Sequence, residues 1–134
     1  MGTFGAIGIA STGMTVNRKW LDAVSDNLAN MNTVTATDGA AFQARYVVAT
    51  AVGYPENGQG VQVKGIELGS AEGRMVYEPE HPLADAEGYV KYPDIDMGAQ
   101  MSQMIMAQRG YQASAAVVDR AKATYEAALQ IGRN

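Results

Sequence analysis

The feature that most constrains the fold is a heptad pattern in the last third of the chain. With Met97 as position a, the a series falls on Met97, Met104, Tyr111, Val118, Tyr125 and Gly132, and most of this stripe is apolar. The d series is assigned to Met101, Gln108, Ala115, Lys122 and Leu129. No proline interrupts this stretch, so the pattern predicts one long helix with a coiled-coil seam. A helix of about 34 residues is roughly 50 Å long and needs a partner along its whole length.

A second heptad pattern occupies the N-terminal stretch. Its a positions are Ile7, Met14, Leu21 and Leu28, and its d positions are Ala10, Asn17, Val24 and Met31. This spacing predicts a helix of about 25 residues, looser near its glycines. The alternative is an ordinary amphipathic helix on a globular core. The equally long C-terminal pattern favours a pair of helices instead.

The segment between the two patterns is rich in Gly and Pro and has no heptads. Residues 44–52 and 60–68 read as two strands, and Asn57-Gly58 between them is a strong hairpin signal. Shorter strands are expected at 75–77 and 89–92. We therefore expect an α+β fold in one structural domain, in which residues 1–31 and 97–134 form a coiled-coil-like helical hairpin and residues 32–96 form a small β-rich segment.

Composition excludes several classes of function. The chain has 134 residues, a formal net charge of −4 and no cysteine. Its ten basic residues are dispersed, so nucleic acid is not an expected ligand. The uncharged first seventeen residues lack the basic start of a signal peptide and are too diluted by glycine for a membrane span. We expect no cleavable export signal and no direct membrane insertion.

The sequence offers little for catalysis. His81 is the only histidine, and a solvated loop explains it better than a site formed with its neighbouring carboxylates. A small enzyme would have to be built around His81, because no nucleophile elbow occurs. Asp94 and Asp96 are best explained as acids at the start of the C-terminal helix. We expect no catalytic residues, no cofactor and no metal site.

The C-terminal helix is more apolar than one partner helix requires. The stretch at 104–107 is apolar on nearly every side, and a helix of that kind is normally buried among several others. Several methionines near its start suit compliant contacts with non-identical neighbours. The pattern indicates a component of an assembly, with a self-sufficient monomeric binding module as the alternative.

Specific motifs support this interpretation. The run at 21–33 (LDAVSDNLANMNT) resembles the N-L/I-A-N-x-N-T signature of the bacterial flagellar axial proteins. The runs at 80–82 (EHP), 87–90 (EGYV), 92–93 (YP) and 104–113 (MIMAQRGYQA) are similar to those of the short proximal rod proteins of the C type. The resemblance extends nearly from end to end. It departs from the family at 34–44, where a basic Gly-Gly-x-Tyr-Arg-Arg-like run is missing.

The resemblance implies a structural subunit of the proximal rod that transmits torque to the distal rod and hook and has no enzymatic activity. The two helices would line the inner tube of the rod, and the β-rich segment would face outward. Implied partners are further copies of the chain, other proximal and distal rod proteins, basal-body ring and adaptor proteins, and the flagellar type III export apparatus. The implied location is the periplasmic rod of the basal body.

The assembly interface is expected on the helices. The candidate residues are Leu21, Val24, Asn27, Leu28, Asn30, Asn32, Met97, Met101, Met104, Arg109, Tyr111, Val118, Tyr125 and Leu129. The three asparagines either bond across a subunit boundary or simply end a helix. Arg109 either forms an intersubunit ion pair or lies at the surface over its own aliphatic stem.

Overall fold

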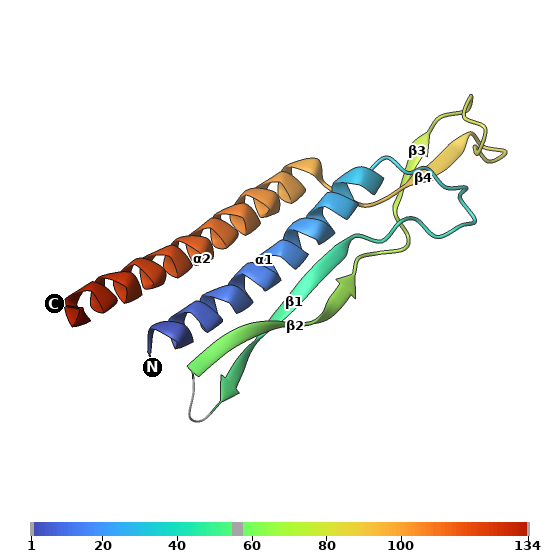
Figure 1. Cartoon of the computed structure of the whole chain (residues 1–134). Coiled ribbons are helices and arrows are strands. Elements are labelled where there is room, and N and C mark those ends of the chain that lie inside the picture. Colours follow the sequence, from blue (N-terminus) through green and yellow to red (C-terminus); the bar gives the residue numbers. More distant parts are fainter. Residues whose placement is uncertain (1, 55–57, 134) are drawn as a thin grey trace.

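The computed structural model describes residues 2–54 and 58–133 and has two long helices, with two small antiparallel sheets between them in the sequence. The elements follow in the order α1 (Thr3–Asn30), β1 (Arg45–Tyr54), β2 (Gly58–Leu68), β3 (Arg74–Tyr77), β4 (Tyr89–Tyr92) and α2 (Met97–Gly132). Figure 1 shows α1 and α2 side by side, the β1–β2 hairpin along α1, and β3–β4 beyond one end of the helices. The expected α+β class and all four expected strands are confirmed.

The two helices touch along a stripe of small residues. In α1, none of the expected a and d side chains is exposed, and Ala10 and Val24 are buried. A Cβ added to Gly110 of α2 would lie 2.5 Å from Asn17 Oδ1 of α1. A Cβ added to Gly13 of α1 would lie 2.9 Å from Ser114 Oγ of α2. The helix backbones therefore approach closely at mid-length.

The expected d series of α2 is wrong. Met101 is 46% exposed and Leu129 51% exposed, and Gln108 and Lys122 are exposed as well. The seam instead uses positions three residues after Met104, Tyr111 and Val118, namely Ala107, Ser114 and Ala121, with Gln100 preceding them. These residues are small or polar, so apolar spacing alone favoured the neighbouring row. A supercoil of the two helices stays a prediction.

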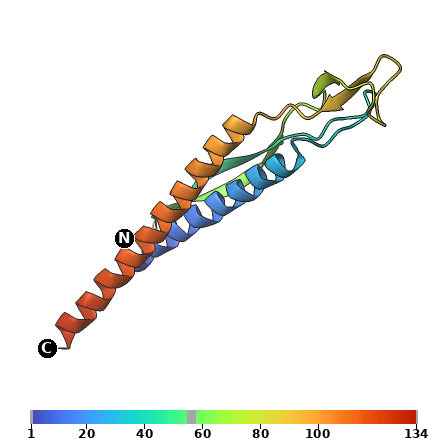
Figure 2. The ribbon, with the colours of Figure 1, turned by 90° about the horizontal axis from the view of Figure 1, so that it is seen from above.

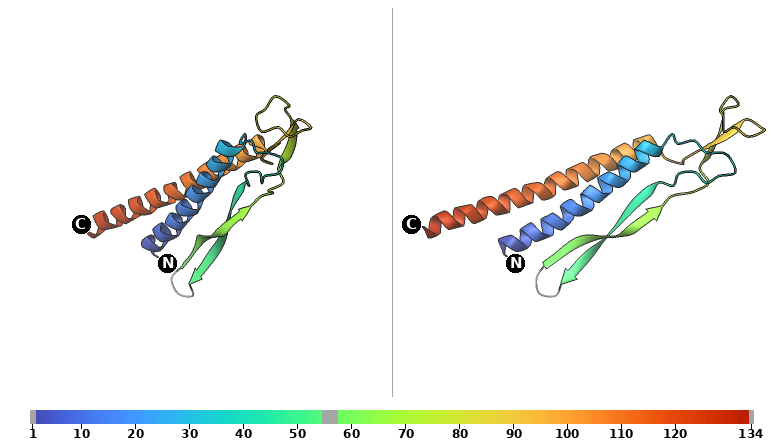
Figure 3. Two further views of the ribbon diagram at one scale, coloured as in Figure 1. Left: turned by 90° about the vertical axis from the view of Figure 1, so that its right-hand side faces the viewer. Right: turned by 45° about the vertical axis from the view of Figure 1, so that its right-hand side comes forward.

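The β1–β2 hairpin lies against α1 instead of extending away from the helices (Figure 3). Its antiparallel register pairs Arg45 with Leu68 and Ala51 with Val61, with an irregularity between Val48 and Ala49. Thr12 of α1 accepts a hydrogen bond from the backbone N–H of Val61 at 3.1 Å. Of the predicted hairpin turn, Asn57 lies outside the described residues and Gly58 begins β2.

The β3–β4 pair forms the far end of the molecule, which we call the tip (residues 70–96). Val90 is fully buried there, and Thr35 pairs with Lys91 as an additional bridge. Gly73 and Gly88 have φ values of 63° and 87°, which favour glycine. Asp96 caps α2, because its carboxylate accepts from Ala99 N at 2.7 Å. Asp94 lies before the helix and does not contribute to its first turn.

The molecule is long and thin, and α2 continues past the start of α1 (Figure 2). Its buried apolar core is small and consists mainly of alanine and valine. None of the described helices has a stretch apolar and long enough to span a bilayer.

Candidate assembly interface

Asn27 forms a buried junction between α1, β1 and α2. Its side chain is fully buried and donates to the carbonyl of Arg45 at 3.0 Å and to Gln100 Oε1 at 3.0 Å. The backbone N–H of Arg45 donates in return to Asn27 Oδ1 at 2.7 Å. The amide thus pairs with one residue of β1 much as a neighbouring strand would, while it also holds α2.

This geometry removes Asn27 from the side chains expected to bond to a neighbouring subunit. Its partners lie within the chain, and no buried side-chain polar atom among the described residues lacks one. Beside it, Asp26 and Arg45 form an exposed salt bridge of 2.7 Å. The motif residue therefore joins three elements of one subunit.

Asn30 is the last residue of α1, and Asn32 lies in the turn that follows the helix. Asn30 donates to the carbonyl of Asp26 at 2.9 Å, and Thr33 donates to Asn30 Oδ1 at 3.3 Å. Both bonds are local, as expected for a side chain in the last turn of a helix. Asn32 is exposed. Its participation in subunit contacts stays a prediction.

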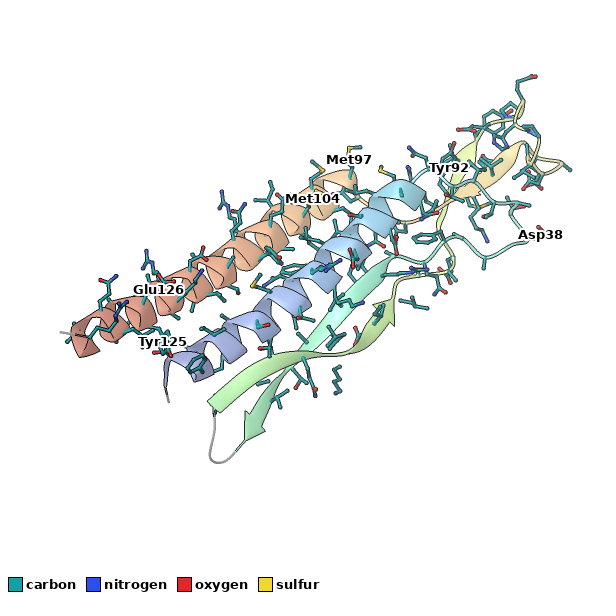
Figure 4. The ribbon with its side chains drawn as sticks, in the orientation of Figure 1. Asp38, Tyr92, Met97, Met104, Tyr125 and Glu126 are labelled. Carbon is teal, nitrogen blue, oxygen red and sulfur yellow. The ribbon has the colours of Figure 1, made fainter. Side chains whose placement is uncertain are left out.

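The start of α2 presents large apolar side chains to solvent. Met97 is 55% exposed, Met101 46%, Ile105 48% and Met106 52%. Met104 lies half-buried, and Figure 4 shows Met97 and Met104 on the first turns of the helix. A contiguous apolar surface of this kind is typical of a protein–protein contact.

The remaining apolar candidates divide between the two helices' seam and the surface. Val24 is buried, and a second group is half-buried at or near the seam: Leu21, Leu28, Tyr111 and Val118. Tyr125 packs edge-on against Phe4, with ring centroids 5.3 Å apart. Leu129 lies on the part of α2 that continues past the start of α1 (Figure 2), and it is exposed.

Arg109 is exposed on α2. Among the residues that the structure describes, its guanidinium forms no salt bridge; the only two ion pairs are Asp26–Arg45 and Lys122–Glu126. An intersubunit partner for Arg109 stays a prediction.

A groove of about 520 Å³ runs between the N-terminal half of α1, β2 and α2. Its walls are almost entirely small and apolar and consist of Ala6, Ile9, Ala10, Gly13, Val61, Ala113, Ser114 and Val117. Because it carries no ionisable side chain, it is suited to apolar packing and not to chemistry.

The titratable groups of the tip serve local structure. Hydrogen bonds from the Tyr89 backbone, from Thr37 and from the loop backbone lower the pKa of Asp85. The Tyr92 hydroxyl donates to Glu78 at 2.9 Å, which raises the pKa of Tyr92. His81 Nδ1 accepts from the backbone N–H of Leu83 at 3.1 Å, as a turn residue does. Over residues 2–54 and 58–133, no three His, Asp or Glu side chains are placed to hold a metal ion.

Sequence reasoning missed three residues that organise the helices: Thr12, Gln100 and Gly110. Gln100 could have been found from its position three residues after Met97, where a true d position falls. Thr12 and Gly110 carry no such signal, because their roles depend on contacts with distant segments.

Comparison with known protein families matches the two segments of the chain that contain most of the two long helices. Residues 7–37 match the family model described as flagella basal body rod protein, and residues 86–131 match the C-terminal model of flagellar basal body rod FlgEFG proteins. These two segments contain most of α1 and α2 together with the Asn27 and Gln100 ends of the junction.

Relatives match over nearly the whole chain. The flagellar basal-body rod protein FlgC of Borreliella burgdorferi is 34% identical, covering 98% of both chains. The FlgC protein of Escherichia coli is 36% identical over 93% of this chain and 94% of its own length. The FlgC protein of Bacillus subtilis is 28% identical over 99% of this chain and its whole length.

Proposed function

This chain belongs to the FlgC family of flagellar basal-body rod proteins, and from that membership we propose that it is a proximal rod subunit that transmits torque to the distal rod and hook. Family membership supports a structural component of the flagellar basal body. The relatives are rod proteins by name, which agrees with the absence of enzymatic activity expected from the sequence.

One observation carries the proposal: α2 is a 36-residue helix whose partner in the chain covers only one face. Large apolar side chains remain exposed at its start, middle and end, at Met97, Met101, Ile105, Met106, Val117, Leu129 and Ile131. Because clustered large apolar side chains at a surface often mark a protein–protein contact, these rows are the proposed contacts to neighbouring subunits.

The elongated shape of the subunit supports the proposed transmission of torque. A helix of this length spans roughly 54 Å, and its hydrogen bonds run along the axis, so it resists stretching. Many modest apolar contacts repeated by symmetry would share the load between subunits. A heterologous contact that does not close produces a helical tube of such subunits.

The partners that we propose are further copies of the chain, proximal and distal rod proteins, and ring and adaptor proteins of the basal body. We also propose export by the flagellar type III apparatus to the periplasm. The small core of the free subunit supports this route, because a chain held by few buried side chains unfolds at little cost.

Purified basal bodies test the proposal. In the bacterium that encodes the chain, a tagged copy should co-purify with rods, and deletion should abolish rod assembly and motility. Hydrogen exchange should show amides of both helices exchanging in the free chain and protected in the rod. Absence of the tagged chain from purified basal bodies would exclude a rod subunit, and full protection of the free monomer would favour a self-sufficient binding module.

A further inference from the structure

The outer edge of β1 has backbone groups that do not bond to β2. Arg45 directs its N–H and C=O groups away from β2, since both bond to the side chain of Asn27. Val61, which is paired with Ala51, likewise donates its N–H to Thr12 and not to β1. Every second residue of an antiparallel strand faces away from its partner strand. Beyond Arg45, the outward residues of β1 are Val47, Ala49, Ala51 and Gly53.

Residues 47–53, which we call the free edge, lie on the outside of the molecule. Asn27 attaches the start of β1 near the end of α1, whereas Thr12 attaches β2 to the first half of α1. The hairpin therefore twists along the helix, and at the end of β1 it is β2 that lies nearer α1 (Figures 1 and 3). Ala49, Ala51 and Gly53 are exposed. Among the described residues, no other segment forms a backbone hydrogen bond with the outward groups of the free edge.

β1 lacks the features that usually protect a strand edge from pairing. Such features are charged residues, proline, short length and a covering segment. Residues 46–54 contain neither a charged residue nor a proline. The irregularity in the hairpin adds its extra residue, Lys64, to β2 and leaves β1 regular. The outer edge of β4, by contrast, is covered by Asp85 and Thr35, and β3 has only four residues.

The free edge is complementary to itself. It begins after Arg45, whose groups are already bonded, and β1 ends at Tyr54, so Thr50 lies at its centre. The sequence is symmetric about the same residue, because residues 48–52 read VATAV. When two copies of β1 run antiparallel with Thr50 opposite Thr50, each outward residue of one copy meets an outward residue of the other. Any other antiparallel register leaves some of these groups unpaired, so a second copy in this register fits the whole edge.

We propose that β1 of one chain pairs antiparallel with β1 of a second copy, with the two Thr50 residues opposite each other. Ala49 then exchanges backbone hydrogen bonds with Ala51 of the second copy. Over residues 48–52 each side chain faces one of its own kind, and threonine pairs are favourable across strands. The two hairpins together form one four-stranded antiparallel sheet, in which each copy adds a strand to the edge of the other.

This contact differs from those proposed for the rod. It uses the same surface on both chains, so it closes as a two-fold dimer and does not propagate. It belongs to the free chain, where it covers an edge that would otherwise pair with other strands. The inference therefore goes beyond the proposed role as a rod subunit and does not depend on it.

A single cysteine tests the pairing and its register. The chain has no cysteine, so Thr50→Cys introduces one thiol at the proposed two-fold axis. Facing residues of a non-hydrogen-bonded antiparallel pair have Cα atoms about 4.5 Å apart, which a disulfide can span. With oxidised glutathione, Thr50→Cys should form a covalent dimer at least about tenfold faster than the control Gln62→Cys, which lies beside Thr50 on β2 and away from the axis. Non-reducing gel electrophoresis measures both rates.

Loss of one donor tests the contact without a cross-link. Ala51→Pro removes the N–H that faces the second copy and no hydrogen bond within the hairpin. Sedimentation of the full-length chains over a concentration series should show dimers for the parent chain and for the control Ala51→Thr, which keeps the N–H. Association of Ala51→Pro should be at least about tenfold weaker, because the two-fold axis removes the donor from both copies. If circular dichroism shows that proline disturbs the fold, the cysteine variants decide alone.

Three outcomes overturn the inference. A parent chain that stays monomeric does so and leaves a strand of another protein as the occupant of the free edge. Equal cross-linking of the two cysteine variants does so as well, as does a folded Ala51→Pro chain that dimerises as strongly as the parent chain. The rod-subunit role is decided separately, by recovery of the parent chain in basal bodies.

Discussion

At the scale of single residues, polar and small side chains organise this protein more than large apolar ones do. Asn27 and Val24 are buried on successive turns of α1, and Gly110 allows Asn17 to lie directly against α2. A small residue at a helix contact brings two backbones together, and a buried amide then requires particular partners. Both effects depend on which residue type stands at the position and not on how hydrophobic it is.

Replacing Asn27 should therefore be costly. Asn27→Ala leaves the backbone N–H of Arg45 and the amide of Gln100 without their partner, and we expect a loss of about 2–3 kcal/mol in the free energy of unfolding. Denaturant titration followed by circular dichroism measures it. Asn32→Ala is the matched control, because Asn32 is exposed, and it should change stability by less than about 0.5 kcal/mol. Equal effects of the two substitutions would contradict the junction.

Two glycines in the helices should respond in opposite directions to the same change. In Gly110→Ala the new methyl group meets Asn17, whose side chain is held by a 2.9 Å hydrogen bond to the carbonyl of Gly13. We expect a loss of about 1–3 kcal/mol from this overpacking. Nothing lies within 4 Å of a Cβ at Gly8. Gly8→Ala should stabilise α1 by about 0.5–1 kcal/mol, and thermal melts of both variants give the comparison.

At the scale of elements, the sequence predicts each helix and strand but not how they face one another. Residues 89–92 were expected as a strand and form β4, and Asp96 caps α2 as its position before the helix suggests. The expected d series of α2 lies four residues after each a position, where the methionine Met101 stands, whereas a d position lies three residues after a, at Gln100, Ala107 and Ser114, whose side chains give little apolar signal. The hairpin is held along α1 by the bonds between Asn27 and Arg45 and by the Thr12 hydroxyl, and no spacing in the sequence reports those contacts.

Thr12 should hold β2 to α1. Its hydroxyl accepts from Val61 N and donates to the carbonyl of Ile9 at 2.6 Å. Thr12→Val keeps the shape and removes the acceptor, so the Val61 amide should exchange faster by about fivefold to tenfold, as loss of about 1 kcal/mol implies. Thr15→Val is the control, since the Thr15 hydroxyl only donates to Ser11 within the helix. Unchanged exchange at Val61 in Thr12→Val would mean that the Thr12 hydroxyl does not hold β2 to α1.

At the scale of the whole molecule, we propose that stability and assembly use different surfaces. The buried core consists mainly of small side chains, in the helix seam and in the segments that follow α1 and precede α2, whereas Met97, Met101 and Met106 of α2 are exposed. We propose that a subunit built this way gains most of its burial from neighbours. The interface residues predicted from the sequence fall into both groups, because periodicity alone does not distinguish an internal seam from an external one.

The double variant Met97→Gln/Met101→Gln should separate the stability of the free chain from its ability to assemble. Gln has a helix propensity close to that of Met, and both side chains are exposed, so the melting temperature of the free chain should be unchanged. Incorporation into basal bodies should fall at least about tenfold, because the variant loses apolar contact area. Immunoblots of purified basal bodies measure incorporation, and Ser102→Ala/Gln108→Ala on the same helix serves as control. Normal incorporation of the methionine variant would remove this row from the interface.

The buried amide of Asn27 fixes how far α1 and α2 are displaced along each other, and therefore the length of the subunit. A seam of alanine, serine and glycine looks nearly the same after one helix slides by a heptad, a displacement of about 10 Å. Any slipped pairing would bury the amide against the wrong residues and leave its hydrogen bonds unmade. Every copy is thus held to one length. In a stack of identical subunits, small differences in subunit length would add up along the stack. One asparagine in each subunit prevents such differences, because it fixes the register of the two helices.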